Sequence, residues 1–303
     1  MPTRVWGFFL KACLLQSTVL WERNPSPCRR LAHLYVFPTS SVPMLPVLLT
    51  DTVTNDLARA VDLALLWGLE GVELRTVGGP DNRVPHVNES AIADRLWEQE
   101  LPVAALAPSI FEGPVAARPV WLNELAMMED TFRFADRVSC DLVLVSGFAA
   151  DDAHDPEAAA EALRRAGGQA ATHDVRLAVV NEAPMAHATG TDVARLLDAV
   201  DHPHVGAAWS PVDAWQAGEP PTDGLAALGD RLWHVRCADG VMGPTGWRDT
   251  PLGEGEIGWP TLLRQLHATG YTGAVSLEVY VEPRRTAGLR MATRLIELID
   301  TTG

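Results

Sequence analysis

One uninterrupted apolar run in the second half of the chain, Leu177–Val180, restricts the fold more than any other feature. It places four aliphatic residues in a row without polar alternation, which is typical of a β-strand buried on both faces. Sheets with both faces covered are mostly parallel, and helices connect their strands. Asn181 and Glu182 follow at once, and Pro184 then favours a loop. The run therefore predicts an α/β fold with a carboxylate at the end of a buried strand.

A second stretch near the carboxyl terminus repeats this pattern. Gly273–Tyr280 reads GAVSLEVY, an apolar strand that leads to Glu278. The carboxyl ends of parallel strands meet at one rim, and α/β enzymes place their catalytic groups there. We therefore expect Glu182 and Glu278 to lie on the same rim.

Segments of strand and helix character alternate from Leu45 onward. The expected strands are 45–49, 71–75, 103–106, 141–146, 177–182, 204–209, 232–237 and 274–278. The expected helices are 56–68, 89–100, 122–137, 156–173, 191–200, 259–269 and 286–299, and the one after the sixth strand is interrupted by Gly218, Pro220 and Pro221. Eight such units in about 260 residues predict a single-domain (β/α)8 TIM barrel of the α/β class. A doubly wound open sheet is the alternative.

Residues 1–44 do not share this pattern, and we assign them to a short N-terminal extension before a barrel of residues 45–303. The apolar stretch VWGFFLKACLL is short and contains Lys11, so it suits neither a signal peptide nor a membrane span. We interpret residues 1–44 either as a loosely ordered extension or as a mis-assigned start. Met44 is a candidate start, because a predicted strand follows it directly.

Charge and cysteine content exclude several classes of protein. The formal net charge is −15, yet residues 1–44 hold five basic residues and one acidic residue, so the barrel carries a net −19. Such a body repels nucleic acid and anionic membranes, and we expect neither as a partner. The four cysteines form no CxxC motif, which favours a reducing, cytoplasmic location. Lys11 is the only lysine, so a Schiff-base lysine in the barrel is excluded.

Five stretches, in this order, carry a resemblance to a known family. They are LWGLEGVELR, LAVVNEAP, HVGAAWSPVDAWQAGEPP, RLWHVRCADG, and PLGEGEIGW followed by GYTGAVSLEVY. The chain resembles the sugar phosphate isomerase/epimerase family, which has xylose-isomerase-like TIM barrels, over nearly all of residues 45–303. The family spans ketose epimerases, aldose isomerases, dehydratases and DNA-repair endonucleases, so the resemblance does not define a substrate.

The resemblance also implies a metal site. Similar barrels bind a divalent cation through Glu, Asp, His and Glu from strands five to eight. The two glutamates match Glu182 and Glu278, whereas the aspartate falls on Ser210 and the histidine on Arg236. The chain therefore resembles a member with a degenerate metal site, in which Glu182 and Glu278 remain as the only matching ligands.

The residues at this site allow two alternatives, a site without metal that is centred on Arg236 and a shifted metal site. Two carboxylates on one rim repel unless a cation or a proton separates them, and the forked guanidinium of Arg236 can supply that positive charge. Serine and arginine are poor ligands for Mn, Mg, Co or Zn, so we expect a site without metal. The alternative is a shifted metal site that recruits Asp213 and His234, although His234 lies about 6–7 Å deeper along its strand than Arg236.

Other polar residues are candidates for substrate binding. Besides Arg236, Asp213 and His234, the candidates are Glu73 and Arg75, which end the second strand on one face, and Arg248, which follows the seventh strand and suits a phosphate group. Each has a structural alternative, such as a salt bridge or a satisfied interior histidine. The sequence GEGEIG at residues 253–258 spells GxGxxG, but it follows no strand and its glutamates repel a pyrophosphate. We therefore expect no nucleotide cofactor.

Two hypotheses of different class follow. The first is an isomerase or epimerase that moves a proton next to the carbonyl of a small sugar, polyol or sugar acid, with Glu182 and Glu278 as the catalytic groups. The second is a sugar-binding or regulatory barrel that has lost its metal-dependent chemistry. A DNA endonuclease is disfavoured by the acidic body. The sequence leaves the oligomeric state open, including a homo-oligomer.

Overall fold

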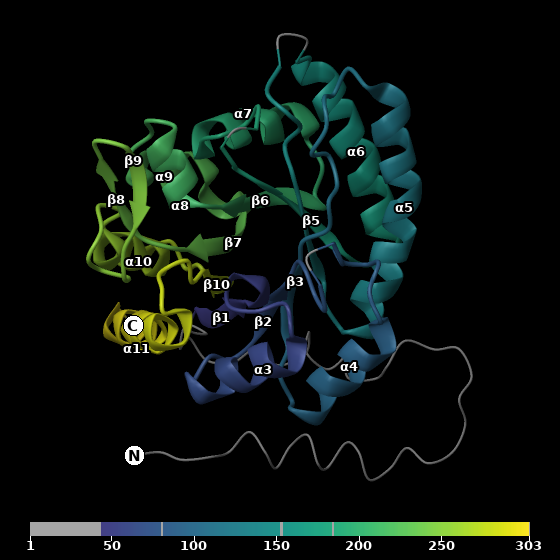
Figure 1. Ribbon diagram of the computed structural model, residues 1–303. Helices are drawn as coiled ribbons and strands as arrows, with labels where there is room; N and C mark the ends of the chain where they lie inside the picture. The colour runs from purple at the N-terminus through teal and green to yellow at the C-terminus, as the bar shows by residue number, and fades with distance from the viewer. Residues whose placement is uncertain (1–43, 80, 152–153, 184, 303) are drawn as a thin grey trace. The chain divides into compact units, whose positions relative to one another are not determined.

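Eight parallel strands close into a barrel in the computed structural model, which describes residues 44–79, 81–151, 154–183 and 185–302 (Figure 1). In spatial order each strand pairs with its neighbour in sequence, and the last pairs with the first. The barrel strands are β1 (Leu45–Leu49), β2 (Val72–Leu74), β3 (Val103–Leu106), β4 (Leu142–Val145), β5 (Arg176–Val180), β6 (Val205–Trp209), β7 (Leu232–Cys237) and β10 (Ala274–Leu277). The predicted TIM barrel is confirmed. The predicted N-terminal extension lies outside the described residues, apart from Met44.

Helices surround the barrel, and five of the described ones begin at a residue whose side chain caps them. The helical segments are η1 (Thr50–Thr52), α3 (Leu57–Leu66), α4 (Glu89–Glu98), α5 (Arg118–Arg137), α6 (Pro156–Thr172), α7 (Gly190–Val200), α8 (Pro211–Gln216), α9 (Pro221–Leu228), η2 (Gly229–Arg231), α10 (Trp259–Ala268) and α11 (Arg284–Thr302). The side chains of Asp56, Asn88, Asp155, Thr189 and Ser210 accept hydrogen bonds from first-turn amides, as N-caps do. The interrupted sixth helix is two short helices, α8 and α9, because prolines begin both.

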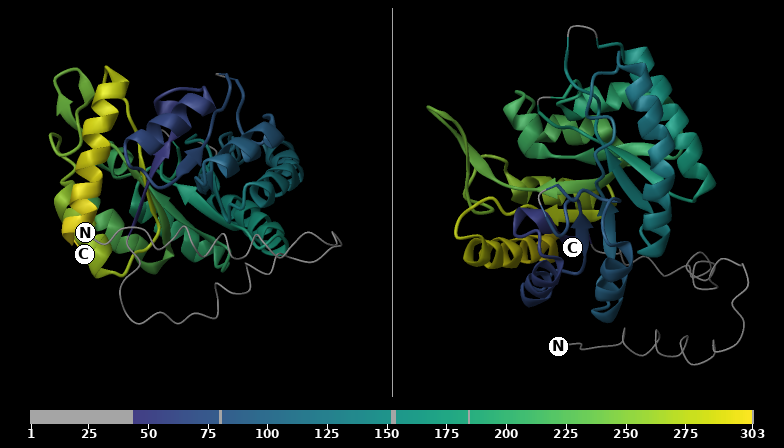
Figure 2. Two further views of the ribbon diagram at one scale, coloured as in Figure 1. Left: turned by 90° about the horizontal axis from the view of Figure 1, so that it is seen from below. Right: turned by 45° about the vertical axis from the view of Figure 1, so that its right-hand side comes forward.

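The last helix packs against the first one of the barrel, and this contact completes the ring. In Figures 1 and 2, α11 lies beside α3. Gly288 of α11 lies against the ring of Trp67, which caps the carboxyl end of α3, and a Cβ at Gly288 would overlap that ring. The glycine therefore lets the two helices approach closely.

A short hairpin follows β7 and is not among the elements predicted from the sequence. Strands β8 (Gly240–Gly243) and β9 (Gly246–Asp249) pair antiparallel around a two-residue turn at Pro244 and Thr245. The hairpin projects from the edge of the barrel (Figure 2, right). It escaped notice because its sequence has few β-branched residues and no alternating apolar pattern.

The barrel interior is lined by small and aliphatic residues below its polar rim. Alternate residues of a strand face the same side, so Ala178 and Val180 point inward below Glu182, and Leu142 and Leu144 point inward below Ser146. Together with Ala105, Ala107 and Ala208, they form one buried cluster, and Trp233 packs against it. This core supports the strand ends that carry the candidate site.

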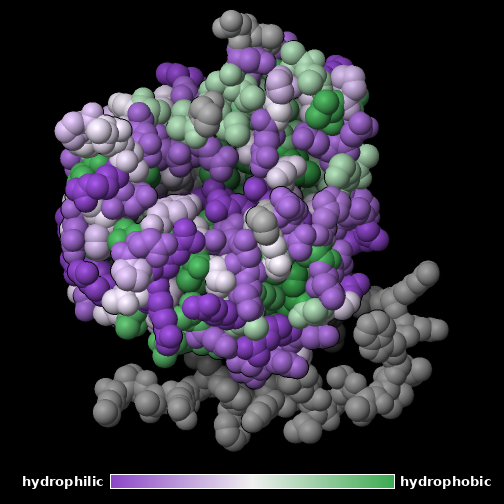
Figure 3. Space-filling view, viewed as in Figure 1, coloured by the Kyte–Doolittle hydropathy of each residue, from purple (hydrophilic) through white to green (hydrophobic). Residues whose placement is uncertain are grey.

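The molecular surface is mainly hydrophilic on the face seen in Figure 3. Hydrophilic residues cover most of the face in Figure 3, and apolar residues appear there in small separate patches. Within the described part of the chain, every helix is too short or too polar to cross a lipid bilayer.

Candidate active site

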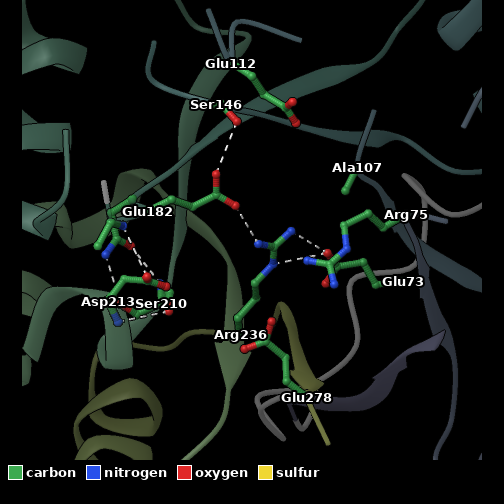
Figure 4. A network of polar contacts seen from close by, with 12 residues as sticks. Glu73, Arg75, Ala107, Glu112, Ser146, Glu182, Ser210, Asp213, Arg236 and Glu278 are labelled. Atoms are coloured by element: carbon green, nitrogen blue, oxygen red, sulfur yellow. Dashed lines mark hydrogen bonds and ion pairs between the residues drawn. The ribbon is translucent and has the colours of Figure 1, made fainter. Parts of the chain in front are cut away.

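Five polar side chains, two from barrel strands and three from the segments that follow strand ends, meet at the carboxyl rim of the barrel (Figure 4). Their direction follows from the fold, because all eight strands run parallel and their carboxyl ends share one rim. Glu73 lies in β2 and Arg236 in β7. Ser146 and Glu278 directly follow β4 and β10, and Glu182 is the second residue after β5. Glu182 and Glu278 are thus brought to the same site, as the sequence predicted.

The guanidinium of Arg236 lies at the centre of this group. Its Nη1 donates to Oε1 of Glu182 at 3.0 Å, and its Nη2 and Nε donate to Oε1 of Glu73 at 2.9 and 3.2 Å. Burial alone would lower the pKa of Arg236, but the charges of Glu73, Glu278 and Glu182 outweigh it and raise the pKa. Arg236 therefore carries a permanent positive charge among three carboxylates.

Glu73 and His234 form a layer beneath Arg236 and have no exposed surface. Nε2 of His234 lies 2.9 Å from Oε2 of Glu73. Burial favours the protonated form of Glu73, yet the neighbouring Arg236 and His234 overcome it and hold the Glu73 pKa below its usual range. Both carboxylate oxygens are engaged, so this placement favours a role in holding Arg236 over the substrate contact expected from the sequence.

Glu182 lies nearer the solvent, with 27% of its side chain exposed. One carboxylate oxygen accepts from Arg236 and the other accepts from the Ser146 hydroxyl at 3.2 Å. Asn181, the residue before it, is fully buried and bonds the backbone of Ser210 in both directions, which ties the ends of β5 and β6 together. The glutamate is therefore held in one orientation at the rim.

Glu278 is the most unusual carboxyl group of the site. It is 6% exposed, and burial raises its pKa to about 7, although Arg236 and Arg75 pull in the opposite direction. Its Oε1 accepts a hydrogen bond from the hydroxyl of Tyr280 at 3.2 Å. A carboxyl group that gains and loses its proton near neutral pH is suited to proton transfer.

The remaining predicted residues lie around this centre, with one exception. Arg75 makes a forked ion pair with Asp51, at 2.9 and 3.0 Å. Asp213 is half-buried, and its Oδ1 accepts from the amide of Ala183. Burial raises its pKa. Arg248 is exposed on β9 of the projecting hairpin, and no hydrogen bond or ion pair joins it to the site among the described residues.

The residues present do not fit a divalent metal. Arg236 occupies the space between the carboxylates with hydrogen bonds to two of them. The Ser210 hydroxyl caps α8 by accepting from the amide of Asp213. His234 is turned toward Glu73, so the shifted site with Asp213 does not assemble. Across the described ranges, no three His, Cys, Asp or Glu side chains converge in a way that could hold a metal ion.

The GxGxxG segment of residues 253–258 surrounds a carboxylate of the chain itself. Oδ2 of Asp239 accepts from the amides of Gly253 and Gly255, and Oδ1 accepts from the amides of Gly240 and Ile257. A Cβ on Gly255 would overlap this carboxylate. These amides therefore serve the loop structure and are not directed at a phosphate.

Several residues of the site were missed by sequence reasoning. Ser146 ends the strand DLVLVS as Glu182 ends its own, so the same signal, a polar residue at the end of a buried run, identifies it. Asp51 and Tyr280 carry weaker signals, because each lies beyond its strand in a segment without periodicity. Arg83, with Glu112 3.2 Å away and the carbonyl of Ala107 2.7 Å away, extends the polar rim toward β3.

Two hollows lie at the opposite, amino-terminal end of the barrel. Their volumes are about 440 and 450 Å³, and both border Trp233 and Asp230. Neither is lined by a residue that the sequence predicted for the site. Because catalytic groups of (β/α)8 barrels come from the carboxyl ends of the strands, the rim around Arg236 is the candidate site.

Several solved structures have a fold similar to that of this chain. A xylose isomerase-like TIM barrel/4-hydroxyphenylpyruvate dioxygenase fusion protein is 22% identical, with a TM-score of 0.73 over 86% of this chain, and the match spans 43% of the fusion protein. D-allulose 3-epimerase from Methylomonas sp., solved with D-allulose, is 15% identical (TM-score 0.67; 84% of this chain and 96% of that one). The IOLI protein with a bound zinc atom is 13% identical (TM-score 0.73; 86% and 99%).

Comparison of the amino-acid sequence with known proteins and protein families identifies the family of this chain. No curated protein matches the chain significantly. The sequence pattern of the family described as "Xylose isomerase-like TIM barrel" matches residues 61–298, which include every polar residue around Arg236 described above except Asp51. The chain therefore belongs to the xylose isomerase-like TIM barrel family.

Proposed function

We propose that the protein is a sugar epimerase or isomerase that moves a proton at the carbon next to a carbonyl group, without a metal ion. The observation that carries this proposal is Glu278, a buried carboxyl group whose pKa lies at about 7, close to the cation Arg236 that also binds Glu182. Its two protonation states are nearly equal in energy at neutral pH, as a reversible proton carrier requires.

The proposed reaction has two balanced steps. One glutamate takes the proton as the C–H bond breaks, and the bonding electrons move onto the carbonyl oxygen to form an enediolate. The other glutamate then returns a proton to carbon, and the electrons move back to restore the carbonyl. Delivery to the opposite face of the same carbon gives an epimer, and delivery to the neighbouring carbon, with a proton shift between the oxygens, gives an isomer.

Arg236 would stabilise the negative oxygen of the enediolate. A guanidinium has five N–H groups, and three of those on Arg236 donate to Glu73 and Glu182. Among the described residues no group accepts a hydrogen bond from the other two N–H groups, so they can bind substrate oxygen at a permanent positive charge held in place by the buried layer below. Preorganised donors of this kind act strongly in a site with little water.

The charge of the rim favours a neutral sugar over a phosphorylated or carboxylated one. Arg75 and Arg236 lie among the carboxylates of Asp51, Glu73, Glu182 and Glu278, and Arg83 at the edge of the rim pairs with Glu112. Each of these three cations therefore already has a carboxylate partner. An anionic substrate would have to displace one of these partners. The epimerase solved with D-allulose, a similar structure, binds an uncharged ketose, which supports the proposal.

Hydrogen exchange into D₂O tests the proposed function directly. Chelator-treated protein is incubated with a panel of ketoses and aldoses, and deuterium at carbon is followed by NMR. We expect exchange with at least one neutral sugar, and its loss in Glu182→Gln and Glu278→Gln. Saturable binding of a sugar without exchange would instead identify a sugar-binding barrel and overturn the enzymatic proposal.

A further inference from the structure

Tyr280 contacts the proposed proton carrier and has no role in the chemistry described so far. It follows Glu278 by two residues in the segment after β10, so in extended chain both side chains lean to the same side. Tyr280 is 40% exposed, whereas Glu278 is 6% exposed. The tyrosine thus extends from the rim down to the buried carboxyl group.

The charged neighbours of Glu278 have their hydrogen bonds elsewhere. They are Arg236 on β7, Arg75 and Glu73 at the end of β2, and Asp213 on α8. Arg236 donates to Glu73 and Glu182, and Arg75 donates to Asp51. Among the described residues, the only hydrogen bond to the Glu278 carboxyl group comes from the hydroxyl of Tyr280, at 3.2 Å to Oε1.

We propose that Tyr280 is the positioning residue for Glu278: its hydroxyl holds Oε1 and leaves Oε2 as the oxygen that exchanges a proton with the substrate. The inference rests on the proposed function and adds a residue to it. It follows from the exclusive contact, because a carboxyl group without a fixed donor rotates about its terminal bond and presents either oxygen.

The hydroxyl is a donor throughout the neutral range. Burial and the adjacent Glu278 raise the pKa of Tyr280, so the phenol keeps its proton. A donor to a carboxylate stabilises the ionised form over the protonated form. Removal of the hydroxyl should therefore make Glu278 harder to ionise, and this effect separates a positioning role from simple packing.

The test compares Tyr280→Phe with a matched control, Tyr271→Phe. The Tyr271 hydroxyl donates to the carbonyl of Ala274 at the other end of β10, so its loss also removes one buried hydroxyl contact. The titration of Glu278 is followed by NMR of protein labelled with ¹³C at the glutamate carboxyl groups, and its signal is assigned by its absence in Glu278→Gln. The pH profile of deuterium exchange is measured on the same variants.

We expect Tyr280→Phe to move the titration of Glu278 upward by about one pH unit, the size of one hydrogen bond to a charged acceptor. The acid limb of the exchange profile should move with it, with a fall of about tenfold at pH 6 and little change in KM. Tyr271→Phe should leave both the titration of Glu278 and the pH profile of exchange unchanged.

An unchanged Glu278 titration in a folded Tyr280→Phe variant overturns the inference, whatever the activity. The proposed function then still stands if exchange is lost in Glu278→Gln. Conversely, if the wild-type protein exchanges hydrogen with no sugar, the proposed function fails, while the NMR titration still decides whether Tyr280 holds Glu278.

Discussion

The guanidinium of Arg236 lies 3.0 Å from the carboxylate of Glu182, measured from Nη1 to Oε1. Arg236 stands where the resemblance assigns a metal-binding histidine. The chain therefore carries a covalently attached cation at a place where similar barrels are expected to bind one from solution. Such a charge cannot be removed by chelation.

Replacement of either glutamate should stop proton transfer without unfolding the protein. We expect Glu182→Gln and Glu278→Gln each to lower the exchange rate by about 10²–10⁴-fold, the range typical of a general acid or base. Glutamine keeps the size and most hydrogen bonds of glutamate, so the circular dichroism spectrum of each variant should match that of the wild type. Deuterium exchange measured by NMR gives the rates.

Glu282 offers the matched control for this prediction. Its side chain is 71% exposed and pairs with Arg284 at the surface, so Glu282→Gln removes the same charge from the same segment without touching the site. This variant should retain full activity. Near-normal activity of both Glu182→Gln and Glu278→Gln would contradict the mechanism.

The buried carboxyl group of Glu278 should make the folded protein less stable as the pH rises. Its pKa is about 7 in the folded protein and 4.5 ordinarily. Between these values the unfolded chain has lost the proton while the folded chain keeps it, so this group makes the protein less stable as the pH rises from 4.5 to 7. The full difference is roughly 3 kcal/mol. Glu278→Gln should therefore raise Tm at pH 8 and have little effect at pH 5.

Thermal unfolding of both proteins at pH 5, 6, 7 and 8 checks this point. The difference in Tm should grow from pH 5 to pH 7 and then level off, because the carboxyl group is ionised in both states above its folded-state pKa. A difference that is constant over this range would mean that Glu278 does not titrate near neutrality in the folded protein.

Much of this arrangement was predictable because strand ends in a barrel are fixed by topology. Short, mostly apolar segments between helical patterns indicated the eight strands, and three of the predicted ranges, 45–49, 103–106 and 232–237, agree with the observed bounds. Once the strands are parallel, Glu182 and Glu278 must share a rim. The spacing of Arg236 and His234 on one strand also predicted that His234 lies a layer deeper, where the structure places it beside Glu73.

The contacts of long side chains were not predictable in the same way. Arg236 reaches Glu73 across 163 positions of sequence, and the choice among Glu73, Glu182 and Glu278 as partners depends on rotamers that no sequence pattern encodes. Arg248 was expected near the site because it follows β7, but the unpredicted hairpin carries it outward. Tyr280 was overlooked because an aromatic residue after a strand is more often a packing residue.

Substitutions of Glu73 and Arg236 should have strongly non-additive effects on the free energy of unfolding. Glu73→Gln leaves the charge of Arg236 with a weaker partner in a buried layer, and we expect a loss of about 3–5 kcal/mol in the free energy of unfolding. Combination with Arg236→Met removes the stranded charge and should recover part of this loss. Urea denaturation of the two single variants and the double variant gives the coupling energy.

A purely additive result, with the double variant as unstable as the sum of both single variants, would contradict a direct ion pair. Glu254→Gln is the matched control, because its partner Arg290 forms a surface ion pair with it. The loss of this surface ion pair should lower the free energy of unfolding by no more than about 1 kcal/mol.

The carboxylate of Asp239 should hold the loop before α10. Asp239→Ala would leave the amides of Gly253, Gly255 and Ile257 without their acceptor. We expect faster hydrogen exchange in residues 251–257 and protection near the wild-type level elsewhere, measured by mass spectrometry. Asp239→Asn keeps one acceptor oxygen and should restore part of the protection. Unchanged exchange in the alanine variant would mean that the loop is held by other contacts.

The most direct test of the central claim is the rate of deuterium exchange before and after complete removal of metal. The protein is treated with a strong chelator, its metal content is checked by elemental analysis, and exchange is measured alone and after addition of Mn, Mg, Co or Zn. We predict equal rates in all samples, because Arg236 supplies the positive charge. Exchange that disappears on chelation and returns with one metal at a stoichiometric content would contradict the account.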